Sequence, residues 1–513
     1  MKKILSLLLV LTMCISLLSG CVFGSKEDTT KKAADTTATQ APVKEDSPST
    51  TEGTDPTAAP AEVTGLEPMT TEPITLKYLN FDSDVLTQEL AKKFMEIYPN
   101  ITVEVQYINV ADFGTTLLNL IGTGDVPDAF MYSDCDFALS NQLLYDMTDL
   151  WEADPENLNI LPTINEFKVG YYDTDMKLGT PMKFFPGIVY IDRTCMETLN
   201  LEMPRKDWTW PEMIQLIKDA TDLTQTPAYY GLGAYTRLDS MYGIAASQDI
   251  RGEFGWDGTG FDLSIWAVGE QEFSDLKLNN YVAPGTETQK MEDWLGDWEG
   301  WAGASGRVAV MTEAYWTYMN LWDSDEYKVD MNINFVPYVI PSVEEVDGIA
   351  NTIATLDMGG LSSATEHPRE AYELLKFMGW GLEGWKAKMA IFHDESITTA
   401  SGLPLIRDAL PAPISMDADL WADYRSLYPT NAEDGPYWDA YFANCTRPVP
   451  FGWMSIAGYW TFCDEYFNNI GIHGLVDSGT AKAADYAEDA TAAANQYHKD
   501  AMMNYFGIEW NPE

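Results

Sequence analysis

The stretch that decides the fold class begins with ITLKYLN at residues 74–80. Apolar and polar side chains alternate in it and β-branched residues are frequent, which is typical of a β-strand. Further along, large apolar residues recur at helical spacing over residues 86–97, and Pro99 follows two residues later. Because proline cannot continue a helix, this pattern predicts a helix that ends before Pro99.

The same alternation of elements continues downstream. Residues 101–107 read ITVEVQY and predict a second strand, residues 113–121 predict a second helix, and AFMY at 129–132 predicts a short buried strand. Strand, helix, strand, helix and strand in this order indicate an α/β domain with a largely parallel sheet. Ligands of such sheets collect at the carboxyl ends of the strands.

Several short motifs have a local structural explanation. Gly124 and Asp128 are turn residues between a helix and a strand, Thr209 is a helix N-cap ahead of Pro211, and His367 precedes a proline at a helix start. We therefore expect these positions to be architectural.

The order of the motifs along the chain is more informative than any one of them. They are GDVPD at 124–128, GTP at 179–181 with GIVYID at 187–192, TWPEM at 209–213, GRVAVM at 306–311, HPREA at 367–371 and VDSG at 476–479. This order resembles the family 1 extracellular solute-binding proteins of ABC transporters, of the maltose- and oligosaccharide-binding type, although the family's usual Tyr-Asn is Ile191-Asp192 here. The resemblance implies a two-lobed α/β fold of the periplasmic-binding-protein type (type II), with a ligand cleft between the lobes.

The resemblance also implies lobe boundaries and partners. Lobe 1 is expected at 74–186 and 341–386, and lobe 2 at 187–340 and 387–513. The partners implied are the permease subunits of an ABC importer, and the ligand-bound closed form is expected to dock on them.

The N-terminus predicts export. Two lysines precede an apolar run at residues 4–18, the layout of a secretion signal. LSGC at 18–21 resembles the lipobox of bacterial lipoproteins, which implies a signal peptide at 1–20 and a lipid on Cys21. Residues 21–73 are rich in Thr, Ala, Pro, Asp and Glu, and we expect them to form a disordered tether. The predicted location is extracytoplasmic, anchored to the cell membrane.

The composition excludes some classes of function. The chain has 513 residues, with 79 acidic and 31 basic side chains and a net charge of −48. Such acidity argues against nucleic-acid binding and against electrostatic attachment to anionic lipid. Hydrophobic residues make up 46% of the chain, which is enough for a large core and excludes wholesale disorder. The charge fits a cationic partner, but the solubility of an acidic surface is the favoured explanation.

Motifs for covalent or metal chemistry are absent. The sequence holds no Walker loop, no G-x-S-x-G, no H-E-x-x-H and no C-x-x-C, and it has only four histidines. We therefore predict no cofactor, no metal site and no enzymatic activity. The remaining cysteines, Cys135, Cys195, Cys445 and Cys463, are either buried thiols or disulfide partners, for example Cys445 with Cys463.

Aromatic residues are abundant, with 17 Trp, 27 Tyr and 20 Phe. Most of the tryptophans are expected in the core. Those in loops or at strand ends offer the flat apolar faces that carbohydrate binding needs, and these are Tyr315, Trp316 and above all Trp453. In relatives of the maltose-binding type the corresponding late loop supplies a stacking aromatic.

Polar candidates for the ligand site come from strand ends and from the predicted crossings between lobes. They are Asp82, Ser133, Asp134, Lys183 with its neighbour Phe184, Tyr235, Arg237 and Asp357. The predicted function is capture of an oligosaccharide by hinge closure. Two alternatives stay open at this stage: a binding protein for a polyamine or other cation, and a secreted carbohydrate-active enzyme.

Overall fold

The structure is a computed structural model. It describes residues 65–81, 84–109, 112–132, 134–166, 174–234, 236–284, 293–295, 302–313, 334–398, 405 and 411–511. Every described helix and strand belongs to one unit, Glu67–Glu513. Within these described ranges, none of the helices combines the length and the apolar character needed to span a membrane.

The first sheet contains the strands that the sequence predicts. Its strand order is β10-β9-β3-β1-β2, with β4 also paired to β9. β1 is parallel to β2 and β3, whereas β9 is antiparallel to β3 and β4. The three predicted strands are confirmed with the same bounds. The strands are β1 (Ile74–Asn80), β2 (Ile101–Tyr107), β3 (Ala129–Tyr132), β4 (Thr180–Pro186), β9 (Thr352–Leu361) and β10 (Pro448–Pro450).

The second sheet has the order β6-β7-β5-β8. β5 is antiparallel to both β7 and β8, and β6 is parallel to β7. An apolar core that includes Ile191, Trp210 and Leu232 covers this sheet, and it extends to Ile353 on β9 and Val449 on β10 of the first sheet. The strands are β5 (Ile188–Asp192), β6 (Tyr230–Ala234), β7 (Val308–Glu313) and β8 (Phe335–Tyr338).

The helices fall into three stretches of the chain. Those before β4 are α2 (Asp84–Ile97), α3 (Phe113–Thr123), α4 (Cys135–Ser140), α5 (Thr148–Glu152) and α6 (Pro162–Asn165). Those between β5 and β7 are α7 (Arg193–Thr198), α8 (Trp210–Asp219), α9 (Leu238–Ala246) and α10 (Leu263–Leu278). Those after β9 are α13 (Pro368–Met378), α14 (Leu382–Phe392), α15 (Ala418–Ser426), α16 (Gly435–Asn444), α17 (Tyr459–Phe462), α18 (Asn468–Ile470), α19 (Ile472–Asp477) and α20 (Ala487–Phe506).

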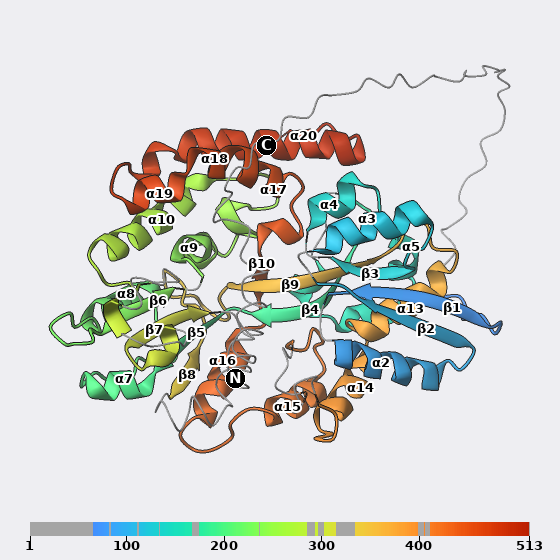
Figure 1. The fold of residues 1–513 in the computed structure, drawn as a ribbon, viewed down its shortest axis with the longest axis horizontal. Helices are drawn as coiled ribbons and strands as arrows, with labels where there is room; N and C mark the ends of the chain where they lie inside the picture. The colour runs from blue at the N-terminus through green and yellow to red at the C-terminus, as the bar shows by residue number, and fades with distance from the viewer. Residues whose placement is uncertain are drawn as a thin grey trace. The chain divides into compact units, whose positions relative to one another are not determined.

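Short helical turns also lie between these elements. The 3₁₀ turns η3 and η7 lie at Glu253–Gly255 and Gly452–Met454, and a π-helical turn, η8, lies at Cys463–Phe467. In Figure 1, α20 runs along the red C-terminal helices, and it packs against both α10 and α17 and touches α4. This long helix therefore connects elements of both sheets.

The chain passes from the first sheet to the second within one residue. β4 ends at Pro186 and β5 starts at Ile188, so only Gly187 lies between them. A Cβ at Gly187 would lie 2.7 Å from the Ile353 carbonyl oxygen and 2.5 Å from a methyl carbon of Ile340. Glycine is required here because the crossing strand lies directly against its neighbours.

The predicted lobe boundaries stay a prediction, but the structure locates the segments near them. α14 packs against α2, and β10 pairs with β9 in the first sheet. Lobe 1 is predicted to end at residue 386. α14 spans this residue, and β10 lies after it. The return of the chain to the first sheet was not visible in the sequence because β10 has only three residues.

The local predictions for caps and core are confirmed. Gly124 ends α3 in the left-handed conformation, with φ of 78°, and Glu212 in the first turn of α8 accepts a hydrogen bond from the Thr209 amide. Eight of the 13 tryptophans in the described residues are buried, as expected for most of them: Trp208, Trp210, Trp256, Trp266, Trp380, Trp385, Trp438 and Trp510. The four cysteines left open by the sequence, Cys135, Cys195, Cys445 and Cys463, are buried free thiols.

Candidate functional site

The candidate ligand site is built around residues 451–460, which we call the aromatic segment. It follows β10 and leads into α17. The Phe451 amide donates to the carbonyl of Ala354 at 3.3 Å, and the Leu356 amide donates to the sulfur of Met454 at 3.1 Å. These two contacts hold the segment along β9, immediately before Asp357.

Three aromatic rings of the segment lie together. The rings of Phe451 and Trp453 are stacked, with centroids 4.4 Å apart and planes inclined by 10°. Trp460 lies 6.0 Å from Trp453 at an inclination of 31°. All three side chains are partly exposed. Flat, partly exposed apolar rings are the groups that pack against the C–H faces of sugars.

Two glycines allow the segment to fold as it does. Gly458 has φ of 82°, a conformation that favours glycine, and a Cβ there would lie 2.6 Å from the Tyr497 carbonyl oxygen. A Cβ on Gly452 would lie 2.4 Å from the ring of Tyr459. The segment is therefore compact and closely packed, although its residues form only short helical turns.

Two buried carboxylates bind the backbone of the segment. Asp136 on α4 accepts hydrogen bonds from the amides of Gly458, at 2.6 Å, and Trp460, at 3.2 Å. Glu253 accepts from the amide of Gly452, at 3.0 Å, and from the Tyr459 hydroxyl, at 2.8 Å. The sequence does not reveal either residue, because both are far from residue 451 along the chain and neither belongs to a motif.

Burial shifts the pKa of both carboxylates upward. It raises the pKa of Asp136 to about 7, although the Gly458 amide acts in the opposite direction, and Asp134 nearby adds to the rise. Burial likewise raises the pKa of Glu253 to about 7, against the Gly452 amide and the Tyr459 hydroxyl. Both groups therefore titrate near neutral pH.

Two predicted site residues, Asp134 and Asp357, lie on elements that contact the turn η7 of the aromatic segment. Asp134 is the N-cap of α4 and accepts a hydrogen bond from the Phe137 amide, and burial raises its pKa to about 6. Asp357 on β9 lies opposite Lys183 on β4, and burial raises its pKa to about 6, although Lys183 lowers it. The proximity of Asp134 and Asp357 to the segment is compatible with the predicted site.

The other predicted residues are placed differently. Phe184 is fully buried and belongs to the core. Several predicted positions lie outside the described residues: Cys21, Asp82, Ser133, Tyr235, Tyr315 and Trp316. Their part in the site stays a prediction.

Arg237 is held by three acidic groups. Its guanidinium lies 2.8 Å from the Asp239 carboxylate, 2.7 Å from Glu270 and 3.0 Å from Asp477. Burial opposes the charge on Arg237, but the three acids outweigh it and raise the pKa of the guanidinium. The same contacts lower the pKa of Asp477 despite burial. Arg237 thus links α9, α10 and α19, and its contribution to ligand binding stays a prediction.

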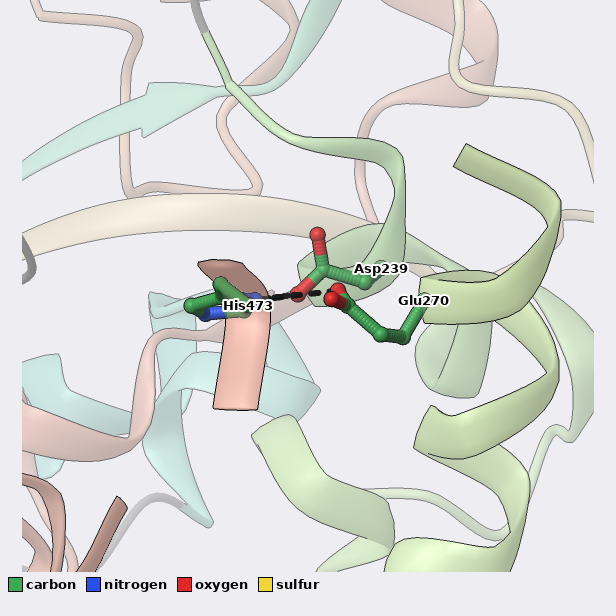
Figure 2. Close-up of side chains that lie close together, drawn as sticks. All are labelled: Asp239, Glu270 and His473. Carbon is green, nitrogen blue, oxygen red and sulfur yellow. Dashed lines mark hydrogen bonds and ion pairs between the residues drawn. The ribbon is translucent and has the colours of Figure 1, made fainter. Parts of the chain in front are cut away.

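Asp239, Glu270 and His473 form a cluster with the residue types of a metal site (Figure 2). His473 Nδ1 lies 3.0 Å from Glu270 and 4.0 Å from Asp239. The guanidinium of Arg237 already supplies the positive charge between the two carboxylates, and the Trp266 indole donates to Asp239 at 3.1 Å. We therefore interpret the cluster as an ion-pair network that joins helices around the second sheet.

The comparisons with known proteins identify the class of protein. The family model described as bacterial extracellular solute-binding protein matches residues 82–379, which is more than half of the chain. The chain belongs to this family. The resemblance stated from the motifs is thereby confirmed.

The chain is similar to several known proteins, at sequence identities of 25% or less in the three examples that follow. A multiple sugar-binding protein from Streptococcus mutans is 25% identical over 324 residues, covering 60% of this chain and 71% of the relative. An ABC substrate-binding protein from Listeria monocytogenes, solved in complex with cycloalternan, has a TM-score of 0.59 and 18% identity, covering 82% of this chain and 98% of that one. A sugar transporter protein from Rhizobium etli in an open conformation has a TM-score of 0.61 and 16% identity, covering 82% and 99%. These structures share the two-lobed α/β fold, which confirms the predicted fold class.

Proposed function

We propose that this protein captures an oligosaccharide outside the cytoplasm and delivers it to an ABC importer. The observation that carries the proposal is the stack of Phe451 and Trp453 with Trp460 beside it. Membership of the solute-binding family supports a binding function, and the sugar-binding relative from Streptococcus mutans supports the ligand class.

The proposed mechanism is closure around the ligand. The direct passage from β4 to β5 at Gly187 and the aromatic segment after β10 provide connections at which the two sheets could change their relative orientation. A ligand that contacts both sides stabilises the closed state. To shift closure from 1:99 to 99:1, it must prefer the closed state by about 5.5 kcal/mol. Several stacked rings together with hydrogen bonds are a sufficient source of such a preference.

The proposal is tested by calorimetric titration of the chain with a panel of uncharged sugars and with one cationic ligand. We choose maltotetraose, mannotriose, glucose and spermidine as probes. Binding of an oligosaccharide without turnover supports the proposal. Hydrolysis of the probe would favour an enzyme, and binding of spermidine alone would favour a cation-binding protein.

Trp453→Ala tests the aromatic site directly. We expect it to weaken oligosaccharide binding by roughly tenfold or more, since a central stacked aromatic contributes strongly to affinity. Trp421→Ala is the matched control, because Trp421 is a partly exposed tryptophan on α15 outside the aromatic segment. Equal losses in both variants would contradict the assignment of the site.

We also propose that Cys21 carries the lipid anchor. The support is the LSGC motif at residues 18–21. When the full chain is expressed in a bacterium, mass spectrometry of the membrane fraction should find a diacylglyceryl group on Cys21. Cys21→Ser should release the protein from the membrane.

A further inference from the structure

The aromatic segment is held by carboxylates from two different sides. Asp136 lies on α4, directly after β3 of the first sheet. Glu253 lies in the turn η3, which packs against α9 and α10 over the second sheet. Both side chains are more than nine-tenths buried, at 7% and 6% exposure. The segment is therefore bound at both ends by groups that belong to different sheets.

The two buried carboxylates are stabilised mainly by hydrogen bonds that the segment donates to them. In the described part of the chain, neither Asp136 nor Glu253 has a basic group within salt-bridge distance. A buried carboxylate without a cation depends on the N–H and O–H groups that donate to it. The segment supplies donors at Gly452, Gly458, Tyr459 and Trp460. The Tyr505 side chain on α20 is a further hydrogen-bond partner of Asp136.

The backbone around Glu253 is itself constrained. The next residue, Phe254, has φ of 55°, which is unusual for a residue other than glycine. Its ring stacks on Tyr459 at 5.6 Å and also contacts Phe462 and Phe467. Packing of this ring against the end of the segment stabilises a turn that directs the Glu253 carboxylate to Gly452.

We propose that Asp136 and Glu253 are positioning residues: they form a two-sided clamp that sets the place of the aromatic segment and, through it, the affinity for the ligand. The effect on ligand affinity rests on the proposed function, whereas the effect on the segment does not. Neither carboxylate needs to touch the ligand.

The two carboxylates differ in a way that can be tested. Asp136 accepts with both of its oxygens, one from Gly458 and the other from Trp460. An asparagine has only one acceptor oxygen, so Asp136→Asn must turn an NH₂ group toward one of these amides. Glu253 uses a single oxygen for both of its bonds. Glu253→Gln can therefore keep both bonds, and only a residue without an acceptor, as in Glu253→Leu, removes them.

The experiment is hydrogen exchange of ligand-free protein at neutral pH, followed by mass spectrometry of peptides that cover residues 451–460. We expect Asp136→Asn and Glu253→Leu to speed exchange in this segment by roughly tenfold or more, as a buried amide loses its acceptor. Glu253→Gln should stay close to the wild type. Asp464→Asn is the matched control, because Asp464 is an exposed acid in the nearby turn η8. Exchange in Asp136→Asn equal to that in Asp464→Asn would overturn the proposal.

A pH series on the wild-type chain keeps the proposal testable if a variant does not fold. The titratable groups facing Asp136 are Asp134, Cys135 and Tyr505, and those facing Glu253 are Asp239 and Tyr459. Opening of the segment exposes both carboxyl groups to water, where their pKa is lower than the value of about 7 in the closed segment. After correction for intrinsic exchange rates, protection of residues 451–460 should therefore decrease as the pH rises from about 5 to 7, relative to that of β1. A constant ratio would contradict the clamp.

The ligand measurement separates this proposal from the proposed function. With maltotetraose as the probe, we expect Asp136→Asn to weaken binding by roughly tenfold and Glu253→Gln to leave it nearly unchanged. If the wild-type chain binds none of the sugars but the exchange results hold, the proposed function fails and the clamp stands. If the variants exchange as slowly as the wild type and the wild-type chain binds a sugar, the clamp fails and the proposed function stands.

Discussion

His498 is a buried histidine in the middle of α20. Its Nδ1 lies 2.7 Å from the Ala457 carbonyl oxygen, at the far side of the aromatic segment, and its ring contacts Trp256 and Trp510. Burial lowers the pKa of the imidazole to about 4, although the Ala457 carbonyl acts in the opposite direction. The native protein therefore keeps His498 neutral at pH values at which the unfolded chain already binds a proton.

His498→Phe tests the consequence for stability. Between about pH 6.5 and 4 the unfolded state binds more protons at this position than the native state, so wild-type stability from His498 is lost as the pH falls. The variant has no titrating group at this position, so this pH-dependent contribution to the free energy of unfolding is absent. It also loses the hydrogen bond to Ala457, which lowers its stability by about 1 kcal/mol at pH 7.5. We expect the stability advantage of the wild type to decrease by about 2 kcal/mol between pH 7.5 and 5.

Urea unfolding of both proteins at the two pH values measures this difference. Asp136, Asp192 and Glu253, whose pKa values burial raises to about 7, have the opposite effect, since they make native stability fall as the pH rises toward 7. These acids are present in both proteins and therefore cancel in the comparison. A constant difference between wild type and variant would show that His498 is not kept neutral by the fold.

Single residues also show the limit of inference from sequence. Its position after β3 makes Asp134 a predicted ligand-site residue, and in the structure its side chain caps α4. Asp136, two positions later, is the residue that reaches the segment. Strand ends can be located from a pattern, whereas the partner of a polar side chain depends on contacts between residues hundreds of positions apart.

At the scale of elements, the parts of the fold that follow a period were predictable. The alternation in β1, β2 and β3 and the helical spacing in α2 arise from burial of one face, which leaves a trace in the sequence. β10 could not be predicted in this way, because a strand of three residues is too short to show an alternating pattern. The aromatic segment could be predicted as a loop containing Trp453, but its shape follows from Gly458, Asp136 and Glu253.

The N-terminus of α8 gives a prediction at this scale. Glu212 accepts hydrogen bonds from the Thr209 amide, at 2.7 Å, and from the Thr209 hydroxyl, at 3.0 Å. Since the first amides of a helix have no partner within it, Glu212→Ala should lower the free energy of unfolding by about 1 kcal/mol. The control is Asp219→Ala at the other end of α8, where a negative charge is unfavourable and its removal should be neutral or slightly stabilising.

Thermal or urea unfolding of the two variants distinguishes capping from a general effect of charge. If loss of any acid from this protein with a net charge of −48 stabilised it through reduced repulsion, both variants would be more stable. The capping contact predicts that Glu212→Ala loses stability whereas Asp219→Ala does not. Equal shifts would contradict the role of Glu212.

At the scale of the whole molecule, the acidity and the aromatic segment suggest different ligands. A net charge of −48 attracts cations over long distances, whereas stacked rings select an uncharged ligand at short range. Salt separates these two contributions, because the Debye length falls from about 10 Å at 0.1 M to about 3 Å at 1 M ionic strength. Stacking against a sugar face has no such dependence.

We therefore expect the affinity for maltotetraose to change by less than about twofold between 0.1 M and 1 M NaCl, because no long-range charge attraction contributes to it. For spermidine, whose charges are screened, the same change of salt should weaken any binding by roughly tenfold or more. Calorimetric titrations in NaCl and in KCl distinguish screening from a specific effect of one ion. A steep salt dependence with the uncharged sugar would contradict a site based on Trp453 and would indicate that the acidic surface contributes directly to ligand binding.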